Sequence, residues 1–170
     1  SHAQQWLPAL DALAERDDLR LVRVTRAGCP APDVTVYNRS ENGRDEVDQA
    51  CTDWRRAVYP RLVSEYDPDV IVVSTRGHVT GIVEEGDRIQ PRNPDHLQAW
   101  ARRWDWTLET LSAGGGTVVV ATILPTMPER VPACLMAHPA GTDRCDFPVS
   151  VDERLSSYND VIRRLPERFP

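Results

Sequence analysis

Two short runs of mainly apolar residues, 70–73 and 118–123, place the strongest constraint on what this chain can fold into. Neither run alternates polar with apolar side chains, as a strand with one solvent-exposed face does. Strands that are apolar throughout are typical of parallel sheets whose two faces are both covered by helices. Each run also follows a segment of helical periodicity, so the sequence predicts the alternation of helix and strand found in α/β domains.

Periodicity along the whole chain predicts four helices and three strands. The helices are expected at residues 5–16, 45–64, 95–111 and 152–165, and the strands at residues 19–25, 70–74 and 117–123. Segments rich in glycine, proline and polar residues, at 27–44, 75–94 and 125–148, are expected to be loops. We therefore predict one α/β domain, a three-layer α/β/α sandwich around a parallel sheet.

Length and charge narrow the class of protein. A chain of 170 residues has the size of one domain, and its net charge is −6. Acidic and basic residues are interspersed, whereas non-specific binding of nucleic acid needs a basic stripe, so nucleic acid is not an expected partner. The apolar runs are far shorter than the roughly 20 residues that a membrane-spanning helix requires.

The four cysteines lie in two neighbouring pairs along the sequence, Cys29 with Cys51 and Cys134 with Cys145. Four cysteines permit three pairings, and the sequence alone does not choose among them. No Cys-x-x-Cys spacing or comparable histidine spacing favours a metal site. Two local disulfides formed in an oxidising compartment fit best, and four free buried thiols are the alternative.

Residues suited to chemistry fall where the predicted strands end. In open parallel sheets, ligands bind beyond the carboxyl ends of the strands. Gly28 follows the strand predicted at 19–25, residues 74–78 follow the strand at 70–74, and Ser1 precedes the first helix. A serine at a helix N-terminus lies where backbone N–H groups favour negative charge, and the N–H of Gly28 would complete an oxyanion site. A plain N-cap serine is the alternative.

Several short motifs extend the pattern over nearly the whole chain. They are SHA at 1–3 with QWLPAL at 5–10, RAGCP at 26–30, Cys51 with WR at 54–55, PDVIVV at 68–73, and CL at 134–135 with Cys145. In this order and spacing they resemble the SGNH domains attached to acyltransferase 3 membrane proteins. The resemblance implies a flavodoxin-like parallel sheet and a serine nucleophile.

Residue by residue, the resemblance matches Ser1 to the nucleophile and Gly28 to the second oxyanion donor, beside the N–H of Ser1 itself. It also implies a histidine held by an aspartate in an Asp-x-x-His motif, which does not occur in these 170 residues. We therefore expect residues 1–170 to be a single SGNH-like domain truncated at both ends. The first strand with its Gly-Asp and the Asp-x-x-His segment would be missing, and the fragment alone would be inactive.

The region after the strand at 70–74 departs from the general SGNH pattern, which has an asparagine there. Thr75, Arg76 and His78 occupy this region and are candidate contacts to substrate, Arg76 above all. His78 is also the one histidine at the right end of the predicted sheet to act as a base. His96 is expected on the surface, in the first turn of a helix.

No metal or cofactor is expected. The acidic run at 84–87 lacks the regularly spaced oxygen ligands of a calcium loop, so we expect a solvated loop. Trp100, Trp104 and Leu108 recur at helical spacing and are predicted to lie in the core and not in a sugar-binding surface. Trp106 falls off that face.

These inferences converge on a serine-dependent O-acyltransferase, with acetyl as the expected acyl group, that modifies cell-surface or cell-wall glycans through an acyl-serine intermediate. The expected partners are a glycan acceptor, an acyl donor and, by the resemblance, an acyltransferase 3 membrane domain in the same full-length chain. That domain would tether this one at the extracytoplasmic side of the plasma membrane. The alternatives are a stand-alone extracellular SGNH carbohydrate esterase and a non-catalytic glycan-binding module.

Overall fold

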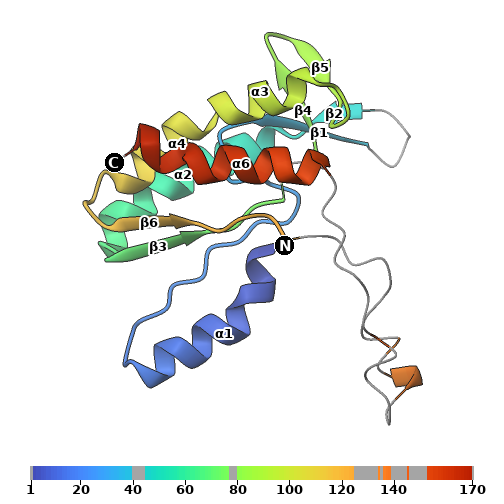
Figure 1. Cartoon of the computed structure of the whole chain (residues 1–170). Coiled ribbons are helices and arrows are strands. Elements are labelled where there is room, and N and C mark those ends of the chain that lie inside the picture. The colour runs from blue at the N-terminus through green and yellow to red at the C-terminus, as the bar shows by residue number, and fades with distance from the viewer. Residues whose placement is uncertain are drawn as a thin grey trace.

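A computed structural model of the chain describes residues 2–39, 45–76, 80–124, 134, 136–138, 145 and 153–169. The helices are α1 (His2–Arg16), α2 (Gln49–Tyr66), α3 (Asp95–Arg102), α4 (Trp104–Ser112) and α6 (Glu153–Arg168). The strands are β1 (Thr35–Arg39), β2 (Asp45–Val47), β3 (Val70–Val73), β4 (Gly81–Glu84), β5 (Asp87–Ile89) and β6 (Thr117–Val120). Figure 1 shows how the strands divide into two separate sheets.

The smaller sheet pairs β3 with β6 in parallel. Val70 lies opposite Thr117, and the register continues to Val73 opposite Val120. Because side chains alternate across a strand, Ile71 and Val73 are buried on the face that α2 and α4 cover (Figure 1). Val70 and Val72 point to the other face and are 56% and 47% exposed. The apolar runs of the sequence therefore do form parallel strands, but one face of the sheet stays open.

The larger sheet is antiparallel, in the order β2-β1-β4-β5. Strands β1, β4 and β5 come from segments predicted to be loops, and β2 comes from the start of the helix predicted at 45–64. A two-residue turn joins β4 to β5, and both of its residues, Glu85 and Gly86, have positive φ angles of 53° and 93°. This conformation matches the right-handed twist of paired strands and closes a tight hairpin.

The prediction of a three-layer α/β/α sandwich with a parallel, flavodoxin-like sheet is wrong for this structure. Within the described part of the chain, only β3 and β6 pair in parallel, and the other strands are antiparallel. Residues 19–25 alternate like a strand in sequence but form no strand, and Leu19 is 58% exposed. The physical reason is that a strand needs a neighbour for its backbone N–H and C=O groups, which local periodicity does not reveal.

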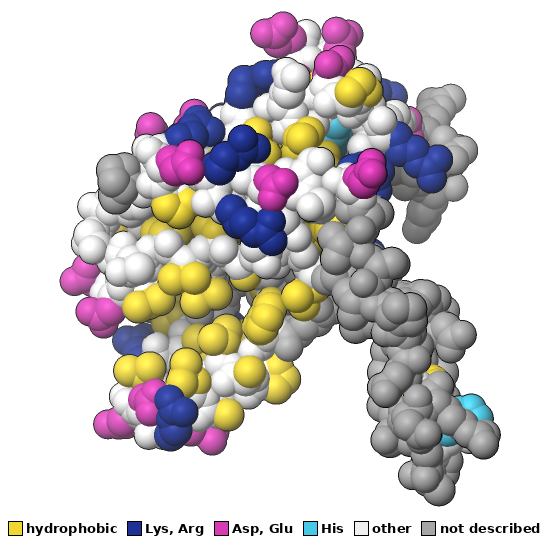
Figure 2. Space-filling view, in the orientation of Figure 1, with side chains coloured by type: hydrophobic (Ala, Val, Ile, Leu, Met, Phe, Trp, Pro, Cys, Tyr) yellow, Lys and Arg dark blue, Asp and Glu magenta, His cyan; other side chains and the backbone are white. Residues whose placement is uncertain are grey.

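A groove of about 530 Å³ separates α1 and residues 19–26 from the open face of β3. Its lining is mostly apolar and includes Leu10, Leu13, Leu21, Val70 and Val72. Figure 2 shows hydrophobic side chains gathered on both sides of this hollow. None of the described helices is long and apolar enough to cross a membrane.

The core lies between the two sheets and the helices α2, α3, α4 and α6. Trp100 and Trp104 are fully buried, with ring centroids 5.4 Å apart in an edge-to-face arrangement, and Leu108 is also buried. The prediction that this stripe belongs to the core is confirmed. The single helix expected at 95–111 is instead two helices, because the chain turns at Arg103 between α3 and α4.

Candidate active site

Gly28 lies in an exposed turn and has a backbone conformation that favours glycine. Its φ angle is +72°, in the left-handed region that residues with a side chain rarely adopt. The residue is exposed, and a Cβ atom placed on it would meet nothing within 4 Å. Among the described residues its N–H has no hydrogen-bond acceptor. This turn therefore presents a free N–H donor to solvent or to a ligand.

The residue after this glycine is covalently fixed to α2. Cys29 forms a disulfide with Cys51, in the first turn of the helix, and their Cα atoms are 5.5 Å apart. A second disulfide joins Cys134 to Cys145. These are the two local disulfides that the sequence favoured. The first one holds the chain immediately beyond Gly28 against a helix.

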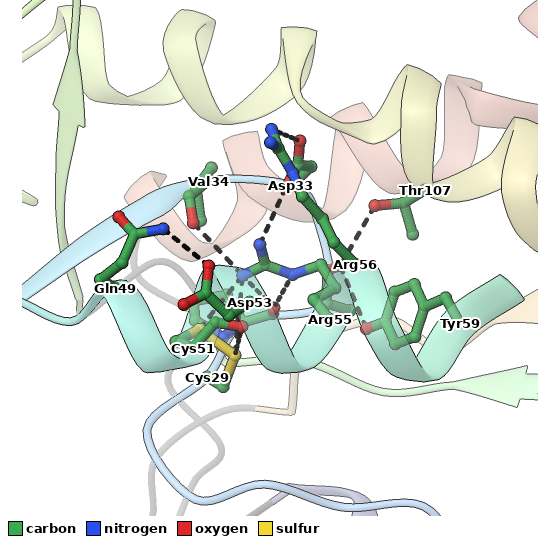
Figure 3. Close-up of polar contacts among 12 residues, drawn as sticks. Cys29, Asp33, Val34, Gln49, Cys51, Asp53, Arg55, Arg56, Tyr59 and Thr107 are labelled. Carbon is green, nitrogen blue, oxygen red and sulfur yellow. Dashed lines mark hydrogen bonds and ion pairs between the residues drawn. A yellow bond between two sulfur atoms is a disulfide. The ribbon is translucent and has the colours of Figure 1, made fainter. Parts of the chain in front are cut away.

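Arg55 holds the next stretch of the same loop (Figure 3). Its guanidinium is fully buried and donates to the carbonyl of Pro30 from Nε and Nη2, at 3.2 and 3.1 Å. Nη2 also donates to the carbonyl of Val34 at 3.2 Å, and Nη1 donates to the carboxylate of Asp33 at 3.1 Å. A buried charge is tolerated only when it is paired and hydrogen-bonded, and this one meets both conditions.

Burial lowers the pKa of Arg55, and the negative charge of Asp33 acts in the opposite direction. An arginine keeps its charge throughout the range in which proteins are folded, so the ion pair is permanent. Arg56 approaches the other carboxylate oxygen of Asp33 at 3.0 Å from the solvent side. The loop carboxylate is thus held between two guanidinium groups, one buried and one exposed.

Ala31, in the middle of the loop, is bound from three sides. Its carbonyl accepts hydrogen bonds from the hydroxyls of Tyr59 and Thr107, both at 3.2 Å. Burial raises the pKa of Tyr59 to about 12, so its hydroxyl stays protonated and remains a donor. The N–H of Ala31 donates to Oγ1 of Thr75 at 3.1 Å. Helices α2 and α4 and the end of β3 therefore converge on one residue.

The structure brings some of the predicted site residues together. Thr75 follows β3 and is buried, and its bond to Ala31 connects the carboxyl end of that strand to the Gly28 loop. Arg76, the next residue, is exposed. Ser1 and His78 lie outside the described residues. The loop and the end of β3 are thus neighbours, although residues 19–25 before Gly28 form no strand.

The prediction that His96 is a surface residue is wrong. Its ring is fully buried between α3 and α6. Nε2 lies 2.8 Å from the carbonyl of Thr80, and Nδ1 is hydrogen-bonded to the hydroxyl of Tyr158. Because a carbonyl only accepts, the neutral ring donates from Nε2 and accepts at Nδ1. Burial lowers the pKa of His96, which favours this neutral form. Both nitrogens are occupied, so His96 is not available as a general base.

The sequence analysis did not identify Arg55 as a residue of the site, although its spacing from Cys51 and Tyr59 indicates that it faces the core. Arg55 follows Cys51 by four residues and precedes Tyr59 by four, so all three lie on one face of α2. A charged residue on the buried face of a helix indicates a partner in the core. No set of three or more His, Cys, Asp or Glu side chains within the described ranges is arranged to hold a metal ion.

Comparison with known proteins shows which family this chain resembles. A family model described as the SGNH domain fused to AT3 domains matches residues 1–170. The comparisons with curated proteins and with solved structures found no match.

Proposed function

Because the chain belongs to the family of SGNH domains fused to AT3 domains, we propose that it is a serine-dependent O-acyltransferase. The family as a whole supports acyl-ester chemistry, either hydrolysis or transfer. The proposed reaction moves an acyl group, with acetyl as the expected group, onto a hydroxyl of a cell-surface or cell-wall glycan. The two disulfides fit an oxidising, extracytoplasmic compartment. An AT3 membrane domain in the same full-length chain would provide the membrane tether.

The observation that carries this proposal is the free N–H of Gly28. A tetrahedral intermediate of acyl transfer develops negative charge on one oxygen, and fixed N–H donors stabilise that charge. Gly28 offers such a donor from an exposed turn with a φ angle of +72°. The rest of its loop is anchored by a disulfide and by the buried Arg55, so the donor is held in place before a substrate arrives.

In the proposed mechanism, the hydroxyl oxygen of Ser1 attacks the carbonyl carbon of the acyl donor. The N–H groups of Ser1 and Gly28 stabilise the oxyanion until the bond to the donor's leaving group breaks and acyl-serine remains. A sugar hydroxyl then attacks the acyl-serine, and the Ser1 oxygen leaves. A general base must accept the serine proton and later activate the sugar hydroxyl. We propose that this base is the histidine of an Asp-x-x-His motif in sequence outside residues 1–170.

Two substitutions in the natural polypeptide that contains these residues test the proposal. Ser1→Ala is expected to reduce turnover of an aryl acetate on the order of 10⁴-fold or more, because it removes the nucleophile. Gly28→Ala keeps the N–H but strains a backbone that needs positive φ. It is expected to reduce kcat roughly 10-fold to 100-fold, less than the complete loss of one oxyanion donor. Mass spectrometry of the wild-type protein after a brief reaction should find the acetyl group on Ser1.

Gly115→Ala is the matched control for Gly28→Ala. Gly115 also has a positive φ angle, +82°, and a Cβ atom placed on it would likewise meet nothing within 4 Å, but it lies in the turn before β6. We expect Gly115→Ala to carry a similar stability cost and to leave kcat unchanged. Turnover that persists in Ser1→Ala contradicts the proposal. Ser1-dependent acetyl release to water that a glycan acceptor does not divert identifies an esterase, and complete inactivity with glycan binding identifies a binding module.

A further inference from the structure

We propose that Arg55 is the positioning residue of the oxyanion site, because it holds the loop whose first residue, Gly28, supplies the N–H donor. This inference rests on the proposed function. Arg55 is fully buried, so it does not touch a substrate and acts through the loop. Neither the family description nor the predicted site residues assign it a role.

The side chain of Arg55 binds several backbone and side-chain groups of the loop at once. Three nitrogens of Arg55 reach the carbonyls of Pro30 and Val34 and the carboxylate of Asp33, at distances between 3.1 and 3.2 Å. Nη2 also lies 3.2 Å from Sγ of Cys51, in the disulfide that fixes Cys29. The guanidinium therefore contacts the loop on both sides of Ala31, at Pro30 before it and at Asp33 and Val34 after it.

The loop has little freedom left once these contacts are made. Ala31 is bound by Tyr59, Thr107 and Thr75, and the N–H of Asp33 donates to the carbonyl of Arg103 at 2.9 Å. Gly28 itself has no such bond among the described residues, but the N–H of Cys29 donates to the carbonyl of Arg26 at 3.4 Å and closes the turn across Gly28. Cys29 is in turn fixed by the disulfide, so the direction of the Gly28 N–H depends on the anchored residues on its carboxyl side, where Arg55 makes the most contacts.

A lysine cannot reproduce these contacts. The guanidinium is planar and presents donors from three nitrogens in a fixed fork, whereas an ammonium group is one point with three donors. At this site a lysine would keep the charge pair with Asp33 and lose the bonds to one or both carbonyls. Arg55→Lys consequently separates the charge of Arg55 from its geometry.

The test compares Arg55→Lys with Arg61→Lys in the natural polypeptide. Arg61 lies on the same helix, is exposed, and pairs only with Glu65 among the described residues, so the same substitution there leaves the loop untouched. For Arg55→Lys we expect kcat on an aryl acetate to fall about 10-fold or more while KM changes less than about threefold, because the lost interaction acts in the transition state. Affinity for an aryl boronic acid, which forms a tetrahedral adduct with a serine, should fall by a similar factor. Arg61→Lys should change neither quantity.

A purely structural role of Arg55 predicts a different result. A folded Arg55→Lys protein with a lower melting temperature and wild-type kcat and boronate affinity overturns the inference and leaves the proposed function standing. If Arg55→Lys does not fold, Asp33→Asn decides: it removes the charge that Nη1 of Arg55 binds and keeps the size of the side chain, so an unchanged kcat overturns the inference, whereas a severalfold loss supports it. A wild-type protein without Ser1-dependent turnover refutes the proposed function itself, which is a distinguishable outcome.

Discussion

His96 and Arg55 are ionisable residues that are completely buried in this fold, and every side-chain nitrogen of each is hydrogen-bonded. Their partners lie far away in sequence: His96 contacts Tyr158, 62 residues on, and Arg55 contacts Pro30, 25 residues before it. A buried imidazole or guanidinium without hydrogen-bond partners would destabilise the fold by more free energy than its hydrogen bonds contribute. Each residue therefore depends on the correct position of the distant element that supplies its partners. Both are therefore sensitive reporters of the tertiary structure.

His96 makes the stability of the protein depend on pH. Burial lowers its pKa in the folded protein, so the unfolded chain takes up a proton at a higher pH than the folded chain does. The contribution of the neutral ring is fully present above the ordinary histidine pKa of about 6.5. It is lost as the pH falls below that value towards the lower pKa of the folded state. We expect the free energy of unfolding to decrease between about pH 7.5 and pH 5 partly for this reason.

His96→Gln tests this expectation, since glutamine does not titrate. The variant should be less stable than the wild type at about pH 7.5 and should lose less stability than the wild type on acidification. Urea denaturation at the two pH values measures both quantities. Equal losses in the two proteins would show that His96 does not contribute to the pH dependence.

At the scale of elements, α2 is the helix that organises the candidate site. Cys51, Arg55 and Tyr59 follow one another at intervals of four residues, and each one binds the loop after Gly28. The helix begins at a side-chain cap, in which Oδ1 of Asp48 accepts from the N–H of Cys51 at 3.0 Å. The start of the helix and the anchor of the loop therefore meet at the same residue.

Removing this cap should destabilise the protein. Asp48→Ala leaves the N–H of Cys51 without its side-chain acceptor, and loss of an N-cap typically costs about 1 kcal/mol. Asp53→Ala, at an exposed position of the same helix, is the control and should stay within about 0.5 kcal/mol of the wild type. Equilibrium urea unfolding measures both differences. Equal effects of the two substitutions would show that the cap has no special role.

The helices and strands differ in how well the sequence predicts them. Helices α1, α2 and α6 and strands β3 and β6 lie close to their predicted positions, because their periodicity and apolar runs are properties of consecutive residues. Strands β1, β4 and β5 lie in predicted loops, and β2 lies in the first three residues of the helix predicted at 45–64. They are short, lie among glycine and proline residues, and become strands only through pairing with one another.

At the scale of the whole molecule, the main anomaly is the open apolar face of β3. Contiguous exposed apolar surface is kept small on most monomeric proteins, and where it occurs it often marks a binding surface. Here it borders a groove of about 530 Å³, with α1 and residues 19–26 on the opposite side. The face is continuous across the small sheet, because Val119 of β6 is exposed beside Val72.

This groove predicts that residues 1–170 bind a hydrophobic fluorescent dye in the native state. Val72→Lys places a charge on the groove lining and should lower the dye fluorescence. Val47→Lys is the control, because Val47 is similarly exposed, at 45% against 47%, and lies on β2 away from the groove. Circular dichroism must show both variants folded. Equal dye binding by Val72→Lys and the wild type would contradict a native apolar groove.

The sequence by itself determined the approximate positions of α1, α2 and α6, the two apolar strands, the buried tryptophan stripe and the family resemblance, and it favoured two local disulfides. These features depend on spacing within one segment or on short motifs, which can be read without knowing the fold. The predicted strand before Gly28 does not form, and it is the Ala31–Thr75 bond that brings the loop after Gly28 to the end of β3.

Only the tertiary structure decided which extended segments pair and which polar residues are buried. Residues 19–25 and 81–84 both have sequences compatible with a strand, yet only the second finds partners for its backbone. Arg55 and His96 are buried because distant residues satisfy them, and a hydrophilic residue without such partners would remain in water. Backbone pairing and the satisfaction of buried polar groups are non-local requirements, so they become visible only when the chain is folded.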